Sequence, residues 1–116
     1  MGYDIDQLPA GCPVQGALNL IGGKWKGMIL YHLLKEECLR FGELQHRVPS
    51  ASLRMLTKQL REMEADGLIS RTVYAEVPPK VEYRLTSLGQ STRQIIDLLA
   101  TWGRDNYRFG PAPAKG

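Results

Sequence analysis

The chain has 116 residues, of which 43% are hydrophobic, and a formal charge of +3 at pH 7. This length fits one compact domain with a modest core, to which a dimer would add buried apolar area. Two cysteines exclude a disulfide framework, and no run approaches the roughly 20 apolar residues that span a bilayer. We therefore expect a cytoplasmic protein with reduced thiols and no membrane partner. A charge this small is weak evidence for a nucleic-acid partner.

The first half of the chain predicts four helices and a short strand. Residues 1–11 show no periodicity and are expected to form a flexible arm. Apolar residues then recur at helical spacing, Pro13 suits the first turn of a helix, and Ser52 suits the cap of another. A break at Gly22–Gly23 and the closing Pro49 separate the helical segments. The expected elements are helices over 13–21, 24–35, 41–48 and 53–66 and a strand over 38–40.

The second half begins with strand-like periodicity. Two strands are expected over 68–74 and 81–86, around a loop that is too long for a tight hairpin and is stiffened by Pro78–Pro79. Ser87 is expected to cap a last long helix. The apolar stripe of this helix, at spacings of four and three, consists of Leu88, Thr92, Ile95, Leu99 and Trp102. Residues 107–116 are rich in Pro, Gly and Ala and are expected to form a disordered tail.

This order of elements is the connectivity of a winged helix-turn-helix, a mainly α fold with a small β-hairpin. We expect the domain to span residues 12–106. In this fold the helix over 53–66 enters the major groove, and the hairpin loop reaches an adjacent groove or the backbone. The partner that the fold predicts is therefore double-stranded DNA.

A series of short motifs follows the order and spacing of one regulator family. The motifs are Cys12-Pro13-Val14, Ile21-Gly22-Gly23-Lys24-Trp25, Arg40-Phe41-Gly42-Glu43-Leu44, Leu56-Thr57-Lys58-Gln59-Leu60, Glu64-Ala65-Asp66-Gly67-Leu68-Ile69, Val77-Pro78-Pro79-Lys80-Val81-Glu82-Tyr83 and Leu85-Thr86-Ser87-Leu88-Gly89. Each motif alone is weakly specific, but together they cover most of the stretch from Cys12 to Trp102. The chain thus resembles the HxlR-type regulators. The resemblance implies a dimeric winged-helix repressor or activator, often acting near its own gene, and some members of the family sense oxidants or electrophiles.

Two positions depart from the family pattern. The turn before the fourth helix reads Pro49-Ser50-Ala51-Ser52, where family members usually have Pro-Gly-Ile-Ser. Loss of the glycine predicts a turn without a positive φ at residue 50. The last helix has Thr92 and Gln94 where Leu and Pro are common, which bears on the dimer packing and not on the fold.

Charge is distributed unevenly along the helix over 53–66. Arg54, Lys58 and Arg61 occur in its first part without an acid, and the acids crowd its end. Cations near a helix N-terminus oppose the macrodipole, which favours anions there, and DNA phosphates supply such anions. The alternative is an ordinary solvated face, but the turn before this helix and the wing after it favour DNA contact.

The contacts of this helix are expected to divide between bases and phosphates. The side chains nearest the base edges are Ser52, Leu53, Arg54 and Thr57. Arg54 can pair bidentately with guanine, whereas Lys58 and Arg61 are expected to meet phosphates. Leu53 is equally compatible with a core position, because it lies three residues before Leu56.

The wing carries Lys80, with Arg71 and Arg84 nearby on its strands. A rigid Pro78–Pro79 tip that presents a lysine suits contact with the minor groove or with phosphates. We therefore expect Lys80 to contact DNA. A plain solvent-exposed hairpin is the alternative.

Cys12 is the candidate redox-sensing residue. It directly precedes a helix that starts at Pro13, and the N-terminus of that helix favours its thiolate. A reactive thiol of this kind could join a partner cysteine in a dimer, and the family resemblance favours such a role. By composition alone, a small buried hydrophobe is the more common state of a free cysteine. Cys38, at a turn, is a weaker candidate.

The dimer interface is expected to come from the first helix and the last. Its anchors are Val14, Leu18, Ile95, Leu99 and Trp102. Trp25 and Trp102 could instead line a ligand cavity, but their helical spacing favours core and interface positions. A small-molecule or oxidant effector is compatible with this arrangement.

No catalytic, metal or cofactor site is predicted. His32 and His46 are isolated, and no Ser-His-Asp or Cys-His arrangement occurs. The sequence therefore favours a homodimeric, sequence-specific DNA-binding regulator, acting on an inverted repeat with half-sites about one helical turn apart. One alternative is a winged-helix protein-interaction module, against which the acid-free basic half of the fourth helix argues. The other is a regulator switched by a small ligand bound between the subunits.

Overall fold

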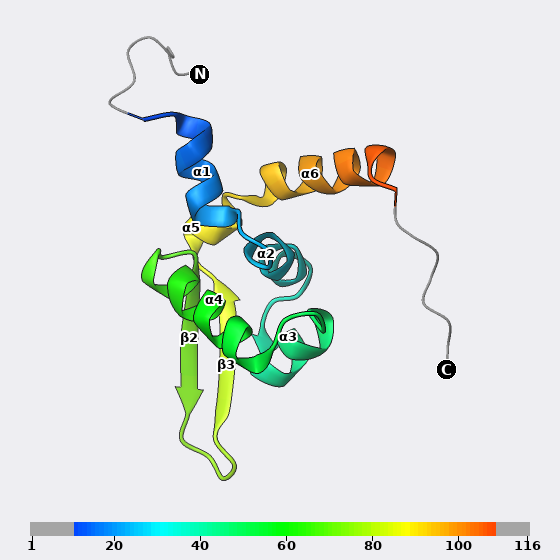
Figure 1. The fold of residues 1–116 in the computed structure, drawn as a ribbon. Coiled ribbons are helices and arrows are strands. Elements are labelled where there is room, and N and C mark those ends of the chain that lie inside the picture. Colours follow the sequence, from blue (N-terminus) through cyan, green and yellow to red (C-terminus); the bar gives the residue numbers. More distant parts are fainter. Residues whose placement is uncertain (1–10, 109–116) are drawn as a thin grey trace, which may run out of the picture.

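The structure is a computed structural model that describes residues 11–108 (Figure 1). The expected N-terminal arm, apart from Gly11, and residues 109–116 of the expected tail lie outside the described residues. The elements in chain order are α1 (Pro13–Ile21), α2 (Lys26–Lys35), β1 (Leu39–Arg40), α3 (Phe41–Arg47), α4 (Leu53–Ala65), β2 (Ile69–Tyr74), β3 (Lys80–Leu85), α5 (Ser87–Gln90) and α6 (Arg93–Asn106). This is the mainly helical winged helix-turn-helix that the periodicity predicts.

The sheet is one strand larger than the expected hairpin. β1 pairs antiparallel with β3, which also pairs antiparallel with β2, so the strand order is β1-β3-β2. Leu39 lies opposite Tyr83 on one side of β3, and Arg71 lies opposite Tyr83 on the other. The short strand predicted near residue 39 thus joins the wing to the segment that leads into α3.

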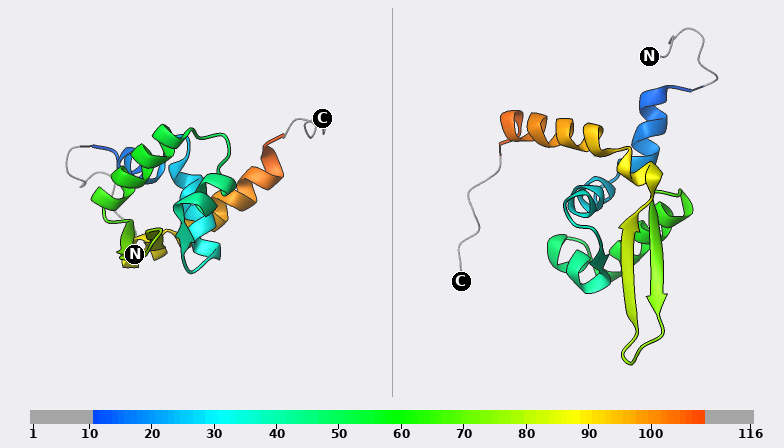
Figure 2. Two further views of the ribbon diagram at one scale, coloured as in Figure 1. Left: turned by 90° about the horizontal axis from the view of Figure 1, so that it is seen from below. Right: turned by 180° about the vertical axis from the view of Figure 1, so that it is seen from behind.

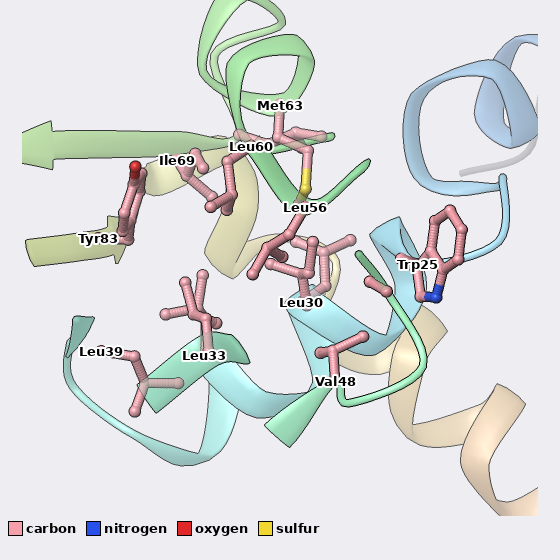
Figure 3. Close-up of a cluster of buried hydrophobic side chains, with 14 of the residues drawn as sticks. Trp25, Leu30, Leu33, Leu39, Val48, Leu56, Leu60, Met63, Ile69 and Tyr83 are labelled. Carbon is pink, nitrogen blue, oxygen red and sulfur yellow. The ribbon is translucent and has the colours of Figure 1, made fainter. Parts of the chain in front are cut away.

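A single apolar core lies where α2, α3 and α4 meet the sheet (Figure 3). α2 contributes Ile29, Leu30 and Leu33, each no more than 2% exposed, as its nearly all-round apolar sequence predicts. Leu56 and Leu60 from α4 pack into the same cluster. The first helix of the helix-turn-helix, α3, contributes mainly Leu44. Trp25 is also a core residue, since only 8% of it is exposed.

Two glycines shift the start of α2 from the expected residue 24 to Lys26. Gly23 has a φ of 76°, a left-handed conformation that a helix does not continue through. A side chain at Gly22 would clash with the backbone carbonyl of Leu18. The segment between α1 and α2 is therefore a tight turn, with Trp25 as the residue before the helix.

The last helix is broken, contrary to the prediction of one long helix capped by Ser87. Thr86 is the actual cap, and its hydroxyl accepts a hydrogen bond from the Gly89 backbone N–H at 3.1 Å. This cap starts the short helix α5, and α6 begins afresh at Arg93. At the break the Gly89 carbonyl accepts both the Thr92 hydroxyl at 2.6 Å and the Thr92 backbone N–H at 3.1 Å, a three-residue turn in place of the four-residue spacing of an α-helix.

α1 and α6 project from the compact part of the molecule in different directions (Figures 1 and 2). α1 has no buried residue, and α6 buries only Ile96. Both helices are nevertheless rich in apolar side chains, so most of their apolar surface is exposed in the single chain.

Candidate nucleic-acid interface

α4 is fixed at its start by the cap that the sequence predicts. The Ser52 hydroxyl accepts a hydrogen bond from the Met55 backbone N–H at 3.1 Å. In the preceding turn, Ala51 is only 6% exposed, and no described residue other than glycine has a positive φ. The turn therefore forms without the family's glycine, as its sequence predicts.

One face of α4 packs inward and the other is open to solvent. Leu56, Leu60 and Met63 are at most 1% exposed, whereas Leu53 is 55% exposed. This exposure decides between the two interpretations of Leu53, which is a surface residue and not part of the core. The open face forms a shallow hollow lined by Leu53, Arg54, Thr57, Lys58, Arg61 and Glu62.

The cations on this face are available for a ligand. Among the described residues, no ion pair of 4 Å or less involves Arg54, Lys58 or Arg61. The one acid in the hollow, Glu62, is paired with Lys26 at 2.9 Å. Lys26 thus neutralises Glu62, and the net charge of the open face stays positive. The Thr57 hydroxyl donates to the Leu53 carbonyl at 2.8 Å, and Thr57 lines the hollow.

The first residue of α2 and the turn before it support α4 at three places that were not predicted from the sequence. Lys26 is only 9% exposed and reaches Glu62. The Trp25 indole N–H donates to the Ser50 hydroxyl at 3.2 Å, in the turn that leads into α4. Gln59 is buried beside Gly23, and its side-chain oxygen has no hydrogen-bond partner. A lysine at the start of an otherwise apolar helix was the signal that could have indicated this support.

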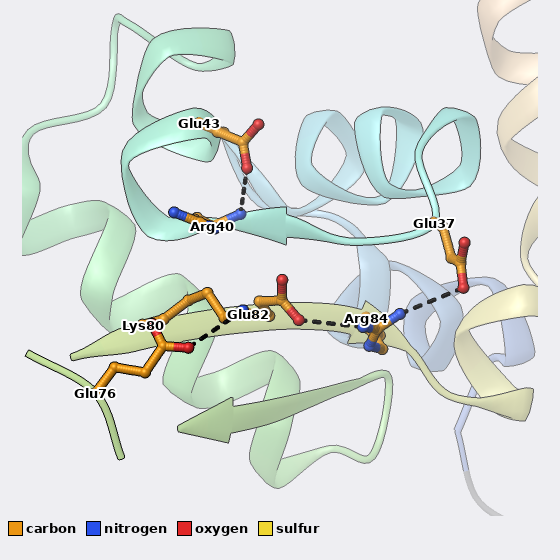
Figure 4. A network of polar contacts seen from close by, with 7 residues as sticks. All are labelled: Glu37, Arg40, Glu43, Glu76, Lys80, Glu82 and Arg84. Atoms are coloured by element: carbon orange, nitrogen blue, oxygen red, sulfur yellow. Dashed lines mark hydrogen bonds and ion pairs between the residues drawn. The ribbon is translucent and has the colours of Figure 1, made fainter. Parts of the chain in front are cut away.

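Lys80 lies at the first position of β3 and not in the tip of the wing, where a presented lysine was expected. Its ammonium group lies 3.7 Å from a carboxylate oxygen of Glu76 and 4.3 Å from the centre of the Tyr74 ring. Arg84 on the same strand pairs with Glu82 at 3.1 Å and with Glu37 at 3.5 Å (Figure 4). Both cations are therefore already engaged within the chain.

Strand alternation divides the wing into two faces. Lys80, Glu82 and Arg84 share one face of β3, and Val81 and Tyr83 share the other. Arg71 lies opposite Tyr83 and so has the orientation of the second set. This inner face forms a groove with α4 and the start of α3, lined by Phe41, Thr57, Leu60, Arg61, Glu64, Arg71, Val81 and Tyr83. The open face of α4 is therefore continuous with a groove that reaches the wing.

The family model for HxlR-like helix-turn-helix proteins matches residues 20–109. The chain belongs to this family. It is 50% identical over 96 residues to the uncharacterized HTH-type transcriptional regulator YybR of Bacillus subtilis, a match that covers 83% of this chain and 76% of YybR. It is 52% identical over 93 residues to the HTH-type transcriptional regulator YdeP of the same organism, covering 80% of this chain and 72% of YdeP.

Solved structures give the same result. The redox regulator HypR in its oxidized form is 48% identical, with a TM-score of 0.79, and the match covers 84% of this chain and all of that one. Diamide-treated YodB from Bacillus subtilis is 30% identical, with a TM-score of 0.67, and covers 87% of this chain and all of that one. This HxlR-like chain is therefore a helix-turn-helix transcriptional regulator and not an enzyme. No helix within residues 11–108 is long and apolar enough to cross a membrane.

The five expected interface anchors of this HxlR-like chain all lie on the surface. Their exposed fractions are 62% for Val14, 55% for Leu18, 46% for Ile95, 55% for Leu99 and 67% for Trp102. Leu98, beside them on α6, is 64% exposed. Exposed apolar side chains on each of these two projecting helices are suited to contact with a partner.

The two cysteines differ in their surroundings. Cys12 is an exposed free thiol at the residue before α1, whereas Cys38 is half-buried ahead of β1. Burial raises the pKa of the Cys38 thiol, although the nearby Arg84 acts against this, and the Glu82 carboxylate raises it further. Cys38 is thus disfavoured as a nucleophile, in line with its place as the weaker candidate.

Proposed function

We propose that this regulator binds a specific inverted-repeat operator as a homodimer, with α4 of each subunit in the major groove. The observation that supports this proposal is the open face of α4, where three cations lie without an ion pair and the only acid is held by Lys26. An unpaired basic helix face beside a wing is a surface suited to the DNA backbone and the base edges. A protein-interaction surface would not need this concentration of unpaired charge.

Residue roles follow from positions along α4. Ser52, Leu53, Arg54 and Thr57 occupy its first turns, which lie nearest the base edges in a helix-turn-helix. Arg54 reads guanine, and the apolar surface of Leu53 or Thr57 meets a thymine methyl. Lys58 and Arg61 contact phosphates. Lys80 contacts the backbone from the wing by exchanging its long ion pair with Glu76 for a phosphate.

The homodimer forms through α1 and α6. Val14 and Leu18 on α1, with Ile95, Leu99 and Trp102 on α6, supply the apolar contact. Burying such side chains stabilises the dimer by roughly 25 cal/mol for each Å² of apolar surface removed from water. Two subunits related by a twofold axis place two α4 helices for half-sites about one helical turn apart.

The second part of the proposal is a redox gate, in which oxidation of Cys12 controls binding to DNA. The thiol is exposed directly before the first residue of α1, the helix that also carries the interface anchors Val14 and Leu18. Oxidation joins Cys12 to a cysteine of the partner subunit: the two thiols give two electrons and two protons to the oxidant and form one disulfide. The likeness to HypR, described as a redox regulator, supports the gate.

The first experiment is fluorescence anisotropy of the reduced protein with the duplex upstream of its own gene. Binding is measured at physiological salt with excess unrelated DNA and again after diamide. Tight binding that survives the competitor is expected. Binding that the competitor abolishes on this duplex and on selected duplexes alike would contradict a sequence-specific regulator.

The gate is tested with Cys12→Ser, since serine keeps the size of the side chain and cannot form a disulfide. We expect the variant to bind DNA like the wild type when reduced and to keep binding after diamide or a quinone. Cys38→Ser is the matched control and should remain sensitive to the oxidant if Cys12 pairs with Cys12 of the other subunit. Undiminished oxidant sensitivity of Cys12→Ser would exclude the gate.

A further inference from the structure

We infer that Arg71 of β2 and Arg61 of α4 hold one phosphate of the DNA backbone between them, in the groove where the recognition helix meets the wing. The inference rests on the proposed DNA binding and adds Arg71 to the residues proposed there to contact DNA.

The register of the sheet places Arg71 on the side of α4. Ile69 is 2% exposed and pairs with Leu85, and Arg71 follows two residues later opposite the buried Tyr83. Residues two apart on a strand point to the same face, so Arg71 points toward α4, as Ile69 does. Arg71 is exposed, since the groove above Tyr83 is open to solvent.

α4 supplies the second cation at the same groove. Arg61 lines both the open face of α4 and the groove beside the wing, so it lies where the two surfaces meet. Thr57, one turn earlier on α4, lines both surfaces as well. A backbone that follows the open face of α4 toward the wing therefore passes between Arg61 and Arg71.

The charges around the groove favour an anion at this point. Neither guanidinium takes part in an ion pair or hydrogen bond with another described residue. By contrast, Arg84 on the outer face of the wing is held by two acids. Two unpaired guanidinium groups facing one groove repel each other until an anion lies between them, and planar guanidinium groups bind phosphate oxygens in bidentate fashion.

One acid opposes the anion. Glu64 lines the same groove, three residues after Arg61 on α4, yet forms no ion pair of 4 Å or less with either arginine. This carboxylate therefore neutralises neither arginine, and both guanidinium groups keep their positive charge for a ligand. Next to a bound phosphate, Glu64 is a repulsive charge that limits affinity for the backbone.

The test measures the salt dependence of binding for three variants of the full chain. Arg71→Gln removes the wing cation, and Arg93→Gln, which removes an equal charge at the start of α6, is the matched control. Glu64→Gln removes the opposing acid. Affinity for a duplex is measured between 50 and 200 mM salt, and thermal unfolding of each variant confirms that its fold is intact.

We expect Arg71→Gln to bind every duplex more weakly and to lose about one unit from the slope of log affinity against log salt. Over a fourfold rise in salt, one phosphate contact corresponds to a loss of about 3.5-fold in affinity, which this variant should no longer show. Arg93→Gln should keep the slope of the wild type, and Glu64→Gln should bind more tightly.

The position of the phosphate is tested with neutral methylphosphonate linkages placed one at a time along the bound duplex. The wild type should lose affinity at each linkage whose phosphate it contacts, and Arg71→Gln should lose less than the wild type at one of these linkages in each half-site. Binding with an unchanged slope in Arg71→Gln would exclude the phosphate site while leaving the proposed function in place. Absence of binding to every duplex would overturn the proposed function and the phosphate site together.

Discussion

Lys26 and Glu62 connect the start of α2 with the recognition helix at 2.9 Å. The lysine is nearly buried and the carboxylate is half-exposed, so the bond is partly shielded from water. Breaking such a bond by removing one partner leaves the other charge poorly solvated. At the same time the bond keeps Glu62 from opposing DNA on the open face of α4.

This bond predicts a pH dependence of stability. Hydrogen bonding to Lys26 lowers the pKa of Glu62 below its ordinary value of 4.5, although partial burial acts against this. A carboxyl with a depressed pKa in the folded state contributes stability above pH 4.5 and loses it as the pH falls through the folded pKa. Glu62→Gln should therefore lower the free energy of unfolding at pH 7, and the difference from the wild type should shrink below pH 4.5.

Urea unfolding at fixed protein concentration measures this difference. The control is the same substitution in a Lys26→Met background, where the pH-dependent part of the difference should be absent. A wild-type advantage that persists unchanged at the lowest pH at which the chain folds would show that Lys26 does not hold Glu62.

Arg54 and Lys58 are four residues apart on the open face of α4 and are predicted to act differently. Arg54→Ala should cost about 1–3 kcal/mol on the preferred operator and relax the choice of base there. Lys58→Ala should weaken all duplexes about equally and flatten the salt dependence, since phosphates carry no sequence information. Binding to a set of operator variants separates the two results. A uniform loss in both variants would refute the division of roles.

Among the elements, the junction of α5 and α6 departs most from regular geometry. Gly89 packs so closely on the Leu68 backbone that a methyl group there would clash with the Leu68 carbonyl and lie 2.9 Å from the Leu85 side chain. Gly89→Ala should lower the free energy of unfolding by about 1–3 kcal/mol, since a packed backbone cannot yield as a flexible side chain can.

Gly42 in α3 is the matched control for this substitution, because a methyl group there meets nothing within 4 Å. Gly42→Ala should be neutral or stabilising by up to about 1 kcal/mol, as expected for alanine in a helix. Chemical denaturation compares the two variants. Equal stability changes would mean that the close approach at Gly89 does not constrain the fold.

The elements also show which signals in the sequence were sufficient to predict a helix and its ends. α4 could be predicted almost to the residue, because a capping serine, an apolar stripe and Gly67, with its φ of 78°, mark it independently. The broken last helix could not be predicted, because apolar spacing continues unchanged through Thr92, whereas the break is a three-residue turn in which the Thr92 N–H and hydroxyl both donate to the Gly89 carbonyl.

The candidate site was predictable in part for similar reasons. The cations of α4 follow from helical spacing, which places Arg54, Lys58 and Arg61 on one surface. The bond between Lys26 and Glu62 joins distant segments, so the lysine at the start of an otherwise apolar helix was its only signal, and the sequence did not indicate the partner. The orientation of Arg71 could have been predicted, because period-two alternation along the strand places Ile69 and Arg71 on one face.

At the scale of the whole molecule, α1 and α6 expose apolar side chains that the proposed dimer would cover. Leu99→Asp places a charge in the proposed interface and should convert the dimer to a monomer, with operator affinity reduced on the order of 100-fold or more because the two half-sites are no longer linked. Analytical ultracentrifugation measures the first effect and anisotropy the second.

Val77→Asp is the control for this prediction, because the side chain of Val77 is fully exposed and lies between β2 and β3. It should not change the oligomeric state. A Leu99→Asp variant that remains dimeric at micromolar concentration would move the interface away from α6.

The two tryptophans lie in opposite environments, one hydrogen-bonded to the turn before α4 and the other exposed on α6. Indole emission shifts to the blue in apolar surroundings and is sensitive to nearby hydrogen-bond partners. The emission of Trp25 should therefore change with the geometry of α4 and the turn before it. The emission of Trp102 should change when the proposed dimer forms. The chain thus carries two intrinsic optical probes, which allow operator binding and subunit association to be followed separately in unlabelled protein.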